Sequence, residues 1–179
     1  RARSGTDRPA GIRRRSRSGR VSHLWQALAL DPEGLGPIHG LLRALMDDPT
    51  PLTSEIAELV AVVVSATNGC AYCVAHHGPR LAAALGDEGL ARAVALDYRT
   101  ANLAARDRVA LDYAVALSCE PAERTCADVE RVREYGFTDA AIVRLSEIAA
   151  YFNLVNRLAL GLGIELEHGL EAWEFGSQK

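Results

Sequence analysis

The spacing of apolar residues along the chain predicts α-helices. Between residues 21 and 179, apolar positions recur every three or four residues, and short runs of apolar–polar alternation are nearly absent. Residues spaced in this way share one face of a helix. With their ends set by capping residues, prolines and glycines, the expected helices cover 23–30, 37–46, 55–67, 70–85, 88–95, 104–118, 126–135 and 139–160. The pattern therefore predicts an all-α chain that folds as a single-domain helical bundle.

One segment carries conflicting signals. The three consecutive valines at 62–64 would by themselves suggest a strand. Thr53 or Ser54 can cap a helix before them, and Glu55 adds an acidic residue to its first turn. The Asn-Gly pair at 68–69 is a typical helix stop. Because the cap, the acidic residue and the stop all agree, we predict a helix here.

The charge is unevenly distributed. Residues 1–20 contain eight arginines and one acidic residue, Asp7, so they carry about +7, and the net charge of −3 leaves about −10 for residues 21–179. The first segment has too few apolar residues to order itself. We predict that 1–20 is a disordered, solvated extension without an essential role and that 21–179 is the helical domain. An organellar transit peptide or a nucleic-acid-binding arm is the alternative, since both are rich in arginine.

The rest of the composition narrows the class of protein. No run of 18 apolar residues exists, so we expect no transmembrane span and no membrane partner. Four cysteines are too few and too unevenly spaced for a secreted disulfide scaffold in a chain of 179 residues. A reducing compartment, the cytoplasm, and a catalytic or metal-binding thiol pair fit better. No nucleic-acid partner is expected for the domain.

The candidate chemistry gathers in residues 68–77, Asn-Gly-Cys-Ala-Tyr-Cys-Val-Ala-His-His. If a helix starts near Cys70, then Cys70 and Cys73 share one face of its first turn, with Cβ atoms roughly 5–6 Å apart, and a disulfide can close between them. Free N–H groups at a helix start favour a thiolate, and His77 can take the proton of Cys73 from one turn away. Cys70, at the very start, is expected to be the more exposed thiol.

A carboxylate precedes this motif. Glu58 lies twelve residues before Cys70, on a helix that must turn at 68–69 and pack against the cysteine helix. Its carboxylate can therefore face the thiol pair. By spacing alone, an ordinary surface glutamate near the start of a helix is the alternative.

The same residues allow a metal-binding interpretation. Its ligands would be Cys70, Cys73 and His77, with Glu58 or His76 as the fourth. Structural zinc sites usually collect ligands from two separated elements, whereas three of these come from one or two helical turns. We therefore expect neither a bound metal nor a cofactor.

The full spacing resembles a known active-site pattern. The residues that carry it are Glu58, Cys70, Cys73 and His77, in the order Glu-x11-Cys-x2-Cys-x3-His. This resembles the alkylhydroperoxidase D group of the carboxymuconolactone decarboxylase-like family. Segments 61–70 and 149–159 are similar to the branch called peroxidase-related proteins. The resemblance covers roughly residues 24–166.

The resemblance implies an antioxidant peroxidase with the all-helical alkylhydroperoxidase D-like fold, assembled as a homo-oligomer. In that scheme the thiol matching Cys73 attacks a hydroperoxide and becomes a sulfenic acid, which Cys70 resolves into a disulfide. Glu58 and His77 would belong to the proton relay. An external dithiol, in the family a lipoyl-bearing protein, would restore the reduced pair.

One departure from the family pattern affects the relay. Well-studied members have a histidine between the cysteines, where this chain has Tyr72. A phenol with a pKa near 10 cannot shuttle protons near neutrality as an imidazole does. Tyr72 and His76 are therefore candidates for an altered relay, in which His76 partly replaces the missing imidazole.

The remaining candidates are weaker. Cys119 and Cys126 are expected to be structural free thiols, since little basic surrounds them. Asn153, Asn156 and Arg157 interrupt an otherwise apolar helix and are expected to fix a buried turn or a subunit contact.

Other functions remain open beside the peroxidase. Lactone decarboxylation needs no thiol pair, and a non-catalytic oligomer of the same fold needs no chemistry at all. The segment after residue 161, with Trp173 and Phe175, is apolar enough to dock, and a partner subunit is a candidate surface.

Overall fold

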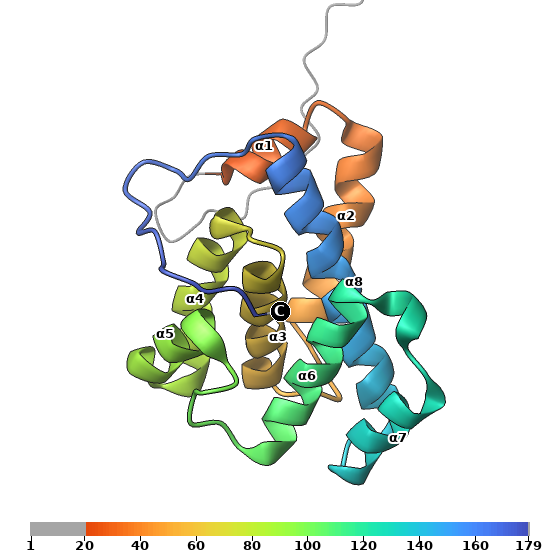
Figure 1. Cartoon of the computed structure of the whole chain (residues 1–179). Helices are drawn as coiled ribbons and strands as arrows, with labels where there is room; N and C mark the ends of the chain where they lie inside the picture. The colour runs from red at the N-terminus through yellow and green to blue at the C-terminus, as the bar shows by residue number, and fades with distance from the viewer. Residues whose placement is uncertain (1–20, 179) are drawn as a thin grey trace, which may run out of the picture.

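The structure, a computed structural model, describes residues 21–178, which form helices and no strands (Figure 1). The elements are α1 His23–Leu28, α2 Pro32–Met46, α3 Ser54–Thr67, α4 Ala71–Leu85, α5 Glu88–Asp97, α6 Ala105–Cys119, the short 3-10 helix η1 Pro121–Glu123, α7 Cys126–Glu134 and α8 Asp139–Gly161. The predicted all-α fold class is confirmed. The disorder predicted for residues 1–20 lies outside the described residues.

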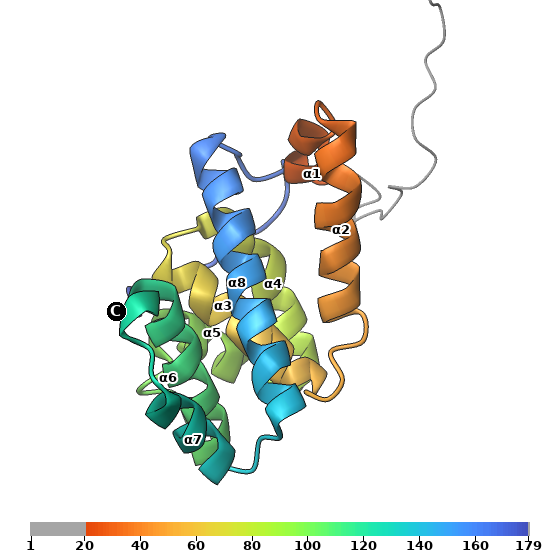
Figure 2. The same cartoon turned by 90° about the vertical axis from the view of Figure 1, so that its right-hand side faces the viewer.

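Helix α3 lies at the centre of the molecule. Every residue from Ile56 to Thr67 is buried, so α3 meets other helices on all of its sides. Helices α4, α6 and α8 surround it, as Figures 1 and 2 show. The three valines at 62–64 are helical because all three side chains are buried at this central position. The stability gained from that burial outweighs the preference of valine for strands.

Local capping chemistry sets most helix ends where the sequence predicts them. The predicted N-caps are found at Thr53, Asp87, Thr125 and Thr138. Gly86 ends α4 with a φ of 65°, a left-handed conformation that favours glycine.

The first two helices differ from the prediction. We expected Pro37 to open the second helix, but α2 begins at Pro32 and contains Pro37. Pro32 stands at the first helical position, where a backbone N–H would have no partner in the helix anyway. Pro37 follows in the second turn, where it removes one backbone hydrogen bond without ending the helix. Correspondingly, α1 stops at Leu28 instead of Leu30.

The C-terminal segment folds back over α4 and α5 (Figure 1). Trp173 is buried against Gly78 of α4, so closely that a Cβ atom on Gly78 would lie 2.4 Å from the indole ring. The side-chain amide of Gln178 donates to the carbonyls of Ala95 and Leu96 at 2.8 and 3.1 Å and closes the end of α5. The segment therefore docks on its own chain, and the suggested docking on a partner subunit is not needed to bury Trp173.

The longest helix, α8, contains polar residues between its apolar ones. Within residues 21–178, no helix has both the length and the apolar composition needed to cross a membrane.

Candidate functional site

The turn between α3 and α4 places both cysteines. Gly69 adopts a φ of 72°, and the backbone N–H of Cys70 donates to the carbonyl of Ser65 at 2.9 Å, which closes α3. Cys70 is consequently the N-cap of α4, and the N–H of Val74 donates to its carbonyl at 3.1 Å. Cys73 follows in the first turn of α4. The predicted i, i+3 arrangement of the two thiols at a helix start is therefore found.

A hydrogen bond between the two sulfurs separates their pKa values. A hydrogen bond from the Cys73 thiol lowers the pKa of Cys70 to about 7, against the opposing effect of burial, and the backbone amides of Tyr72 and Cys73 add to the lowering. The same hydrogen bond, burial and the charge of Cys70 raise the pKa of Cys73 well above its ordinary value. When the pair loses one proton, the negative charge therefore lies on Cys70, at the N-terminal end of α4 where backbone N–H groups face it, and the remaining proton stays on Cys73.

Neither thiol is open to solvent. Cys70 is 0% exposed and Cys73 is 4% exposed. The expectation that Cys70 is the more exposed thiol is wrong. The turn at Gly69 directs Cys70 inward, toward the side chain of Asn156 on α8, so a start-of-helix position does not bring exposure here.

His77 and Glu58 form a buried pair beside the thiols. The Nδ1 atom of His77 lies 2.7 Å from Oε2 of Glu58, and each residue is 8% exposed. When Glu58 is ionised, it only accepts hydrogen bonds, so Nδ1 of His77 donates and Nε2 is left as an acceptor. The edge of the imidazole ring meets Phe152 at a centroid distance of 4.7 Å. Glu58 therefore faces the interior, and the surface-glutamate alternative is wrong.

Tyr72 and His76 meet at a second carboxylate, Glu167. The hydroxyl of Tyr72 donates to Oε1 of Glu167 at 2.8 Å, and Nε2 of His76 lies 2.9 Å from Oε2. Burial lowers the pKa of His76, although the charge of Glu167 opposes it. Burial also raises the pKa of Tyr72, so this phenol stays protonated near neutrality.

Sequence reasoning missed Glu167 as a member of the site. It lies 95 residues after Tyr72, in the segment that follows α8, and belongs to no motif. Burial tends to raise the pKa of Glu167, but hydrogen bonds from the His23 amide and the Tyr72 hydroxyl outweigh it and lower the pKa. The participation of Tyr72 and His76 in a relay stays a prediction, now with Glu167 as their common partner.

A buried network of amides supports the thiol turn. The side-chain N–H of Asn156 donates to Oγ of Ser65 at 3.0 Å, while its oxygen accepts from Asn68 at 2.9 Å. Asn156 and Ser65 also hydrogen-bond to Cys73 and favour its ionised form. Asn68 donates further to Asn153 at 3.1 Å. Asn153 and Asn156 fix the turn that precedes Cys70, as predicted, but the turn is not buried, since Asn68 is half-buried and Gly69 is exposed.

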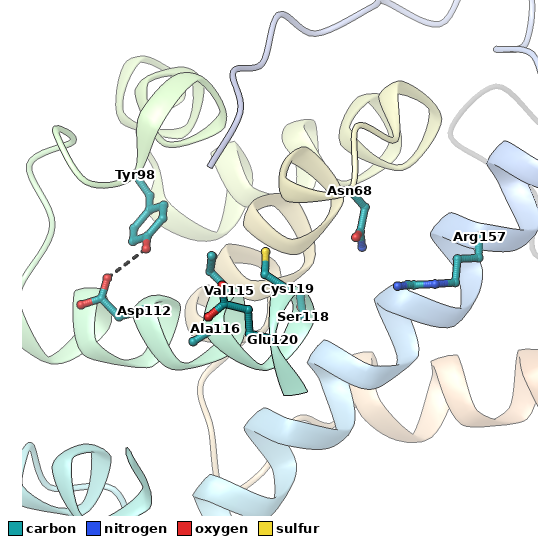
Figure 3. Close-up of a pocket in the computed structure, with 9 residues that line it drawn as sticks. All are labelled: Asn68, Tyr98, Asp112, Val115, Ala116, Ser118, Cys119, Glu120 and Arg157. Carbon is teal, nitrogen blue, oxygen red and sulfur yellow. Dashed lines mark hydrogen bonds between the residues drawn. The ribbon is translucent and has the colours of Figure 1, made fainter. Parts of the chain in front are cut away.

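A cleft of about 620 Å³ lies beside this turn and is lined in part by Asn68 (Figure 3). Asn68 and Arg157 line it together with the end of α6, including Cys119. The hydroxyl of Tyr98 donates to Asp112 at 2.9 Å in its wall (Figure 3). Cys70 and Cys73 do not line this cleft, so it is separate from the thiol pair.

The two other cysteines, Cys119 and Cys126, are exposed free thiols. The metal-binding alternative finds no support in the described part of the chain. No group of three or more His, Cys, Asp or Glu side chains within residues 21–178 could hold a metal ion.

Comparison with known proteins relates this site to a family. The carboxymuconolactone decarboxylase family model matches residues 38–105. That range contains Glu58, both thiols of the pair and His77. No curated protein matches the chain in sequence.

Two solved structures match most of the chain. They are the alkylhydroperoxidase AhpD core of an uncharacterized peroxidase-related protein from Ralstonia eutropha JMP134 and an uncharacterized peroxidase-related protein from Silicibacter sp. TM1040. Each has 32% sequence identity and a TM-score of 0.81, over 86% of this chain and 81% of the other.

A third structure shares the fold at lower identity. It is the debrominase Bmp8 in complex with 2,3,4-tribromopyrrole, with 19% identity and a TM-score of 0.73 over 84% of this chain and 79% of the other. At that identity the likeness concerns the fold alone. The family match and the two relatives at 32% identity show that the chain belongs to the carboxymuconolactone decarboxylase family, among its alkylhydroperoxidase D-like, peroxidase-related members.

Proposed function

We propose that the protein is a thiol-dependent peroxidase that reduces hydroperoxides through a disulfide formed by Cys70 and Cys73. The observation that carries this proposal is the pair itself: two buried free sulfurs at a helix start that are joined by a hydrogen bond, which lowers the pKa of Cys70 to about 7. A thiolate is the reactive form of cysteine. The second sulfur of the pair is close enough to form a disulfide with the first once the first is oxidised.

The first step oxidises one sulfur. Cys73 loses its proton to His77, and its thiolate attacks the terminal oxygen of the hydroperoxide. An S–O bond forms and the O–O bond breaks, so Cys73 becomes a sulfenic acid. The departing alkoxide takes the proton from His77 and leaves as an alcohol.

The second step closes the disulfide. The Cys70 thiolate attacks the sulfur of the Cys73 sulfenic acid, an S–S bond forms and the S–O bond breaks, and the hydroxide that leaves takes a proton from solvent and becomes water. An external dithiol then reduces the disulfide and is itself oxidised to a disulfide. We propose a lipoyl-bearing protein as the source of this dithiol.

Two features support Cys73 as the attacking sulfur. It retains 4% exposure where Cys70 has none, so an incoming peroxide meets it first. It also precedes His77 by four residues on α4, which places the two side chains one turn apart on the same face. The His77–Glu58 hydrogen bond orients the imidazole and stabilises it when it carries the extra proton.

The test counts thiols in a variant that contains only the pair. Cys119→Ser/Cys126→Ser removes the two exposed thiols, which would otherwise dominate the count. One equivalent of cumene hydroperoxide should consume two thiols per chain and release one equivalent of 2-phenyl-2-propanol. A dithiol such as dihydrolipoamide should restore both thiols. If the pair reacts no faster than free cysteine, the peroxidase proposal is wrong.

A further inference from the structure

Tyr151 on α8 holds a buried hydroxyl without a partner. The residue is 3% exposed, and its hydroxyl has no hydrogen-bond partner among the described residues. Buried polar atoms in folded proteins are almost always paired, because an unpaired one loses its bonds to water without replacement. A phenylalanine would fill the same space without that cost. The contacts within the folded chain therefore do not explain why this position carries a hydroxyl group.

The other tyrosines with limited exposure do not share this feature. The hydroxyls of Tyr72, Tyr98 and Tyr113 pair with Glu167, Asp112 and Ser146, at 2.8, 2.9 and 2.9 Å. The fold thus satisfies its tyrosine hydroxyls wherever they are withdrawn from water, and Tyr151 is the exception among them.

The position of Tyr151 connects it to the reacting sulfur. When Cys73 is ionised, its charge acts on the phenol of Tyr151, so the two groups lie within electrostatic range of each other. The ring edge of Tyr151 meets Phe152 at a centroid distance of 5.6 Å, and Phe152 meets His77 at 4.7 Å. Tyr151 thus belongs to the surroundings of Cys73 and His77.

The phenol of Tyr151 remains a donor throughout the reaction. Burial raises its pKa, and Cys73 raises it further whenever that sulfur is ionised. A phenol in this state keeps its proton near neutrality and offers one O–H to any acceptor that enters. The reaction proposed above brings such an acceptor, since negative charge develops on the peroxide oxygen that leaves.

We propose that Tyr151 is a catalytic residue that donates a hydrogen bond to the leaving oxygen of the hydroperoxide, an inference that rests on the proposed peroxidase function. As Cys73 attacks the terminal oxygen and the O–O bond breaks, the Tyr151 hydroxyl stabilises the alkoxide. The alkoxide then takes its proton from His77, and Tyr151 keeps its own. A fixed donor aimed at a developing oxyanion contributes substantially to a rate because it need not reorganise.

The test is Tyr151→Phe in the full-length Cys119→Ser/Cys126→Ser chain, which removes the hydroxyl, keeps the ring and lacks the two exposed thiols. The reduced variant should react with cumene hydroperoxide on the order of 10- to 100-fold more slowly than the same chain with Tyr151. Its alkylation by iodoacetamide should change by less than about twofold, because iodide leaves without needing this donor. Tyr113→Phe is the control, since it also removes one hydroxyl but from a phenol paired with Ser146.

Each other outcome contradicts the proposal in a different way. An unmodified protein that fails to reduce cumene hydroperoxide overturns the peroxidase function, and the role of Tyr151 with it. An active protein with an equally active Tyr151→Phe variant overturns the role of Tyr151 alone. Equal slowing of peroxide reduction and alkylation means that the hydroxyl acts on the sulfur, which also contradicts the assigned role.

A second measurement tests the proposal if the Tyr151→Phe variant does not fold. Replacing Tyr151 with 3-fluorotyrosine keeps the hydroxyl and makes it a stronger donor. The ratio of the peroxide rate to the iodoacetamide rate should then rise above that of the unmodified protein. A ratio that stays the same or falls overturns the proposal.

Discussion

The hydrogen bond between Cys70 and Cys73 governs the chemistry at the residue scale. Cys70 has the lower pKa because Cys73 donates to it and because it caps a helix. Cys73 has the higher pKa because it gives that hydrogen bond inside the protein. The negative charge therefore develops first on Cys70, whereas the small exposed area belongs to Cys73. A titration of the thiols should show two pKa values, and these describe the pair rather than either residue alone.

The lowered pKa of Cys70 predicts the pH dependence of thiol reactivity. A thiol with an ordinary pKa of 9.0 gains its thiolate only in alkaline solution, whereas a pKa of about 7 places that gain near neutrality. Alkylation of the pair by iodoacetamide should rise with a midpoint near pH 7 in the Cys119→Ser/Cys126→Ser variant, where the rate is measured from pH 5 to 10. A single midpoint close to 9 would show that the hydrogen bond does not separate the two pKa values.

The division of labour between the sulfurs is the second prediction. In the Cys119→Ser/Cys126→Ser chain, Cys70→Ser should react once with cumene hydroperoxide and stop at a sulfenic acid that dimedone traps, because the resolving sulfur is absent. Cys73→Ser should consume no peroxide. Mass spectrometry of the trapped adduct reports both results. A sulfenic acid on Cys70 in the Cys73→Ser variant would reverse the assigned roles and make the thiolate charge, rather than exposure, the deciding factor.

The third prediction concerns Glu58. Glu58→Gln removes the carboxylate that orients His77 and stabilises its protonated form, so peroxide reduction should slow on the order of 10- to 100-fold. Disulfide formation by the strong oxidant diamide should proceed, since both sulfurs remain. Glu55→Gln is the matched control, because Glu55 lies exposed in the first turn of the same helix. Similar activity of both variants would remove Glu58 from the site.

At the scale of elements, the C-terminal segment ties the site together. It brings Glu167 to Tyr72 and His76 and buries Trp173 on α4. The guanidinium of Arg92 on α5 lies over the indole ring of Trp173, 4.5 Å from its centroid. Docking of this segment therefore stabilises α4, the helix that carries Cys73.

The fourth prediction tests this docking through Gly78. A methyl group there would overlap the ring of Trp173, so Gly78→Ala should lower the free energy of unfolding by about 1–3 kcal/mol, as overpacking does. Urea unfolding followed by tryptophan fluorescence measures the change. Gly40→Ala is the control, since nothing lies within 4 Å of that position in α2. It should be neutral or stabilising by up to about 1 kcal/mol, and equal losses in both variants would contradict the packing argument.

At the scale of the whole molecule, α8 leaves apolar side chains uncovered. Val143, Leu154 and Leu160 on this helix are exposed, and Leu162 follows directly after it. Exposed apolar side chains on one helix can take part in an interface between subunits. The homo-oligomer suggested by the apolar pattern of α8 and by the family resemblance stays a prediction.

The fifth prediction is therefore an oligomer in solution. Sedimentation equilibrium at micromolar concentration should give a mass that is a multiple of the 19.2 kDa chain. Leu160→Lys, which places a charge on the exposed side of α8, should shift the distribution toward smaller species without changing helix content by circular dichroism. A sharp monomer for the unmodified chain would rule out the predicted assembly.

The features that the sequence alone determined depend on interactions between residues close together in the chain. Helix periods, caps at residues such as Thr53 and Asp87, and the stop at Gly69 depend on neighbours a few positions away, so they could be predicted. The i, i+3 thiols follow from the same helix geometry. The pairing of Glu58 with His77 needed one further step, the packing of two consecutive helices across a short turn.

Only the tertiary structure decided which groups are buried and what they meet. Cys70 lost its expected exposure because Asn156, far along the chain, packs against its turn. Glu167 accepts a hydrogen bond from Tyr72 across 95 positions of the chain. The packing of α8 and of the segment after it sets such contacts through the combined fit of many side chains, and no spacing along one segment encodes them. The burial that shifts each pKa is for the same reason a property of the folded chain.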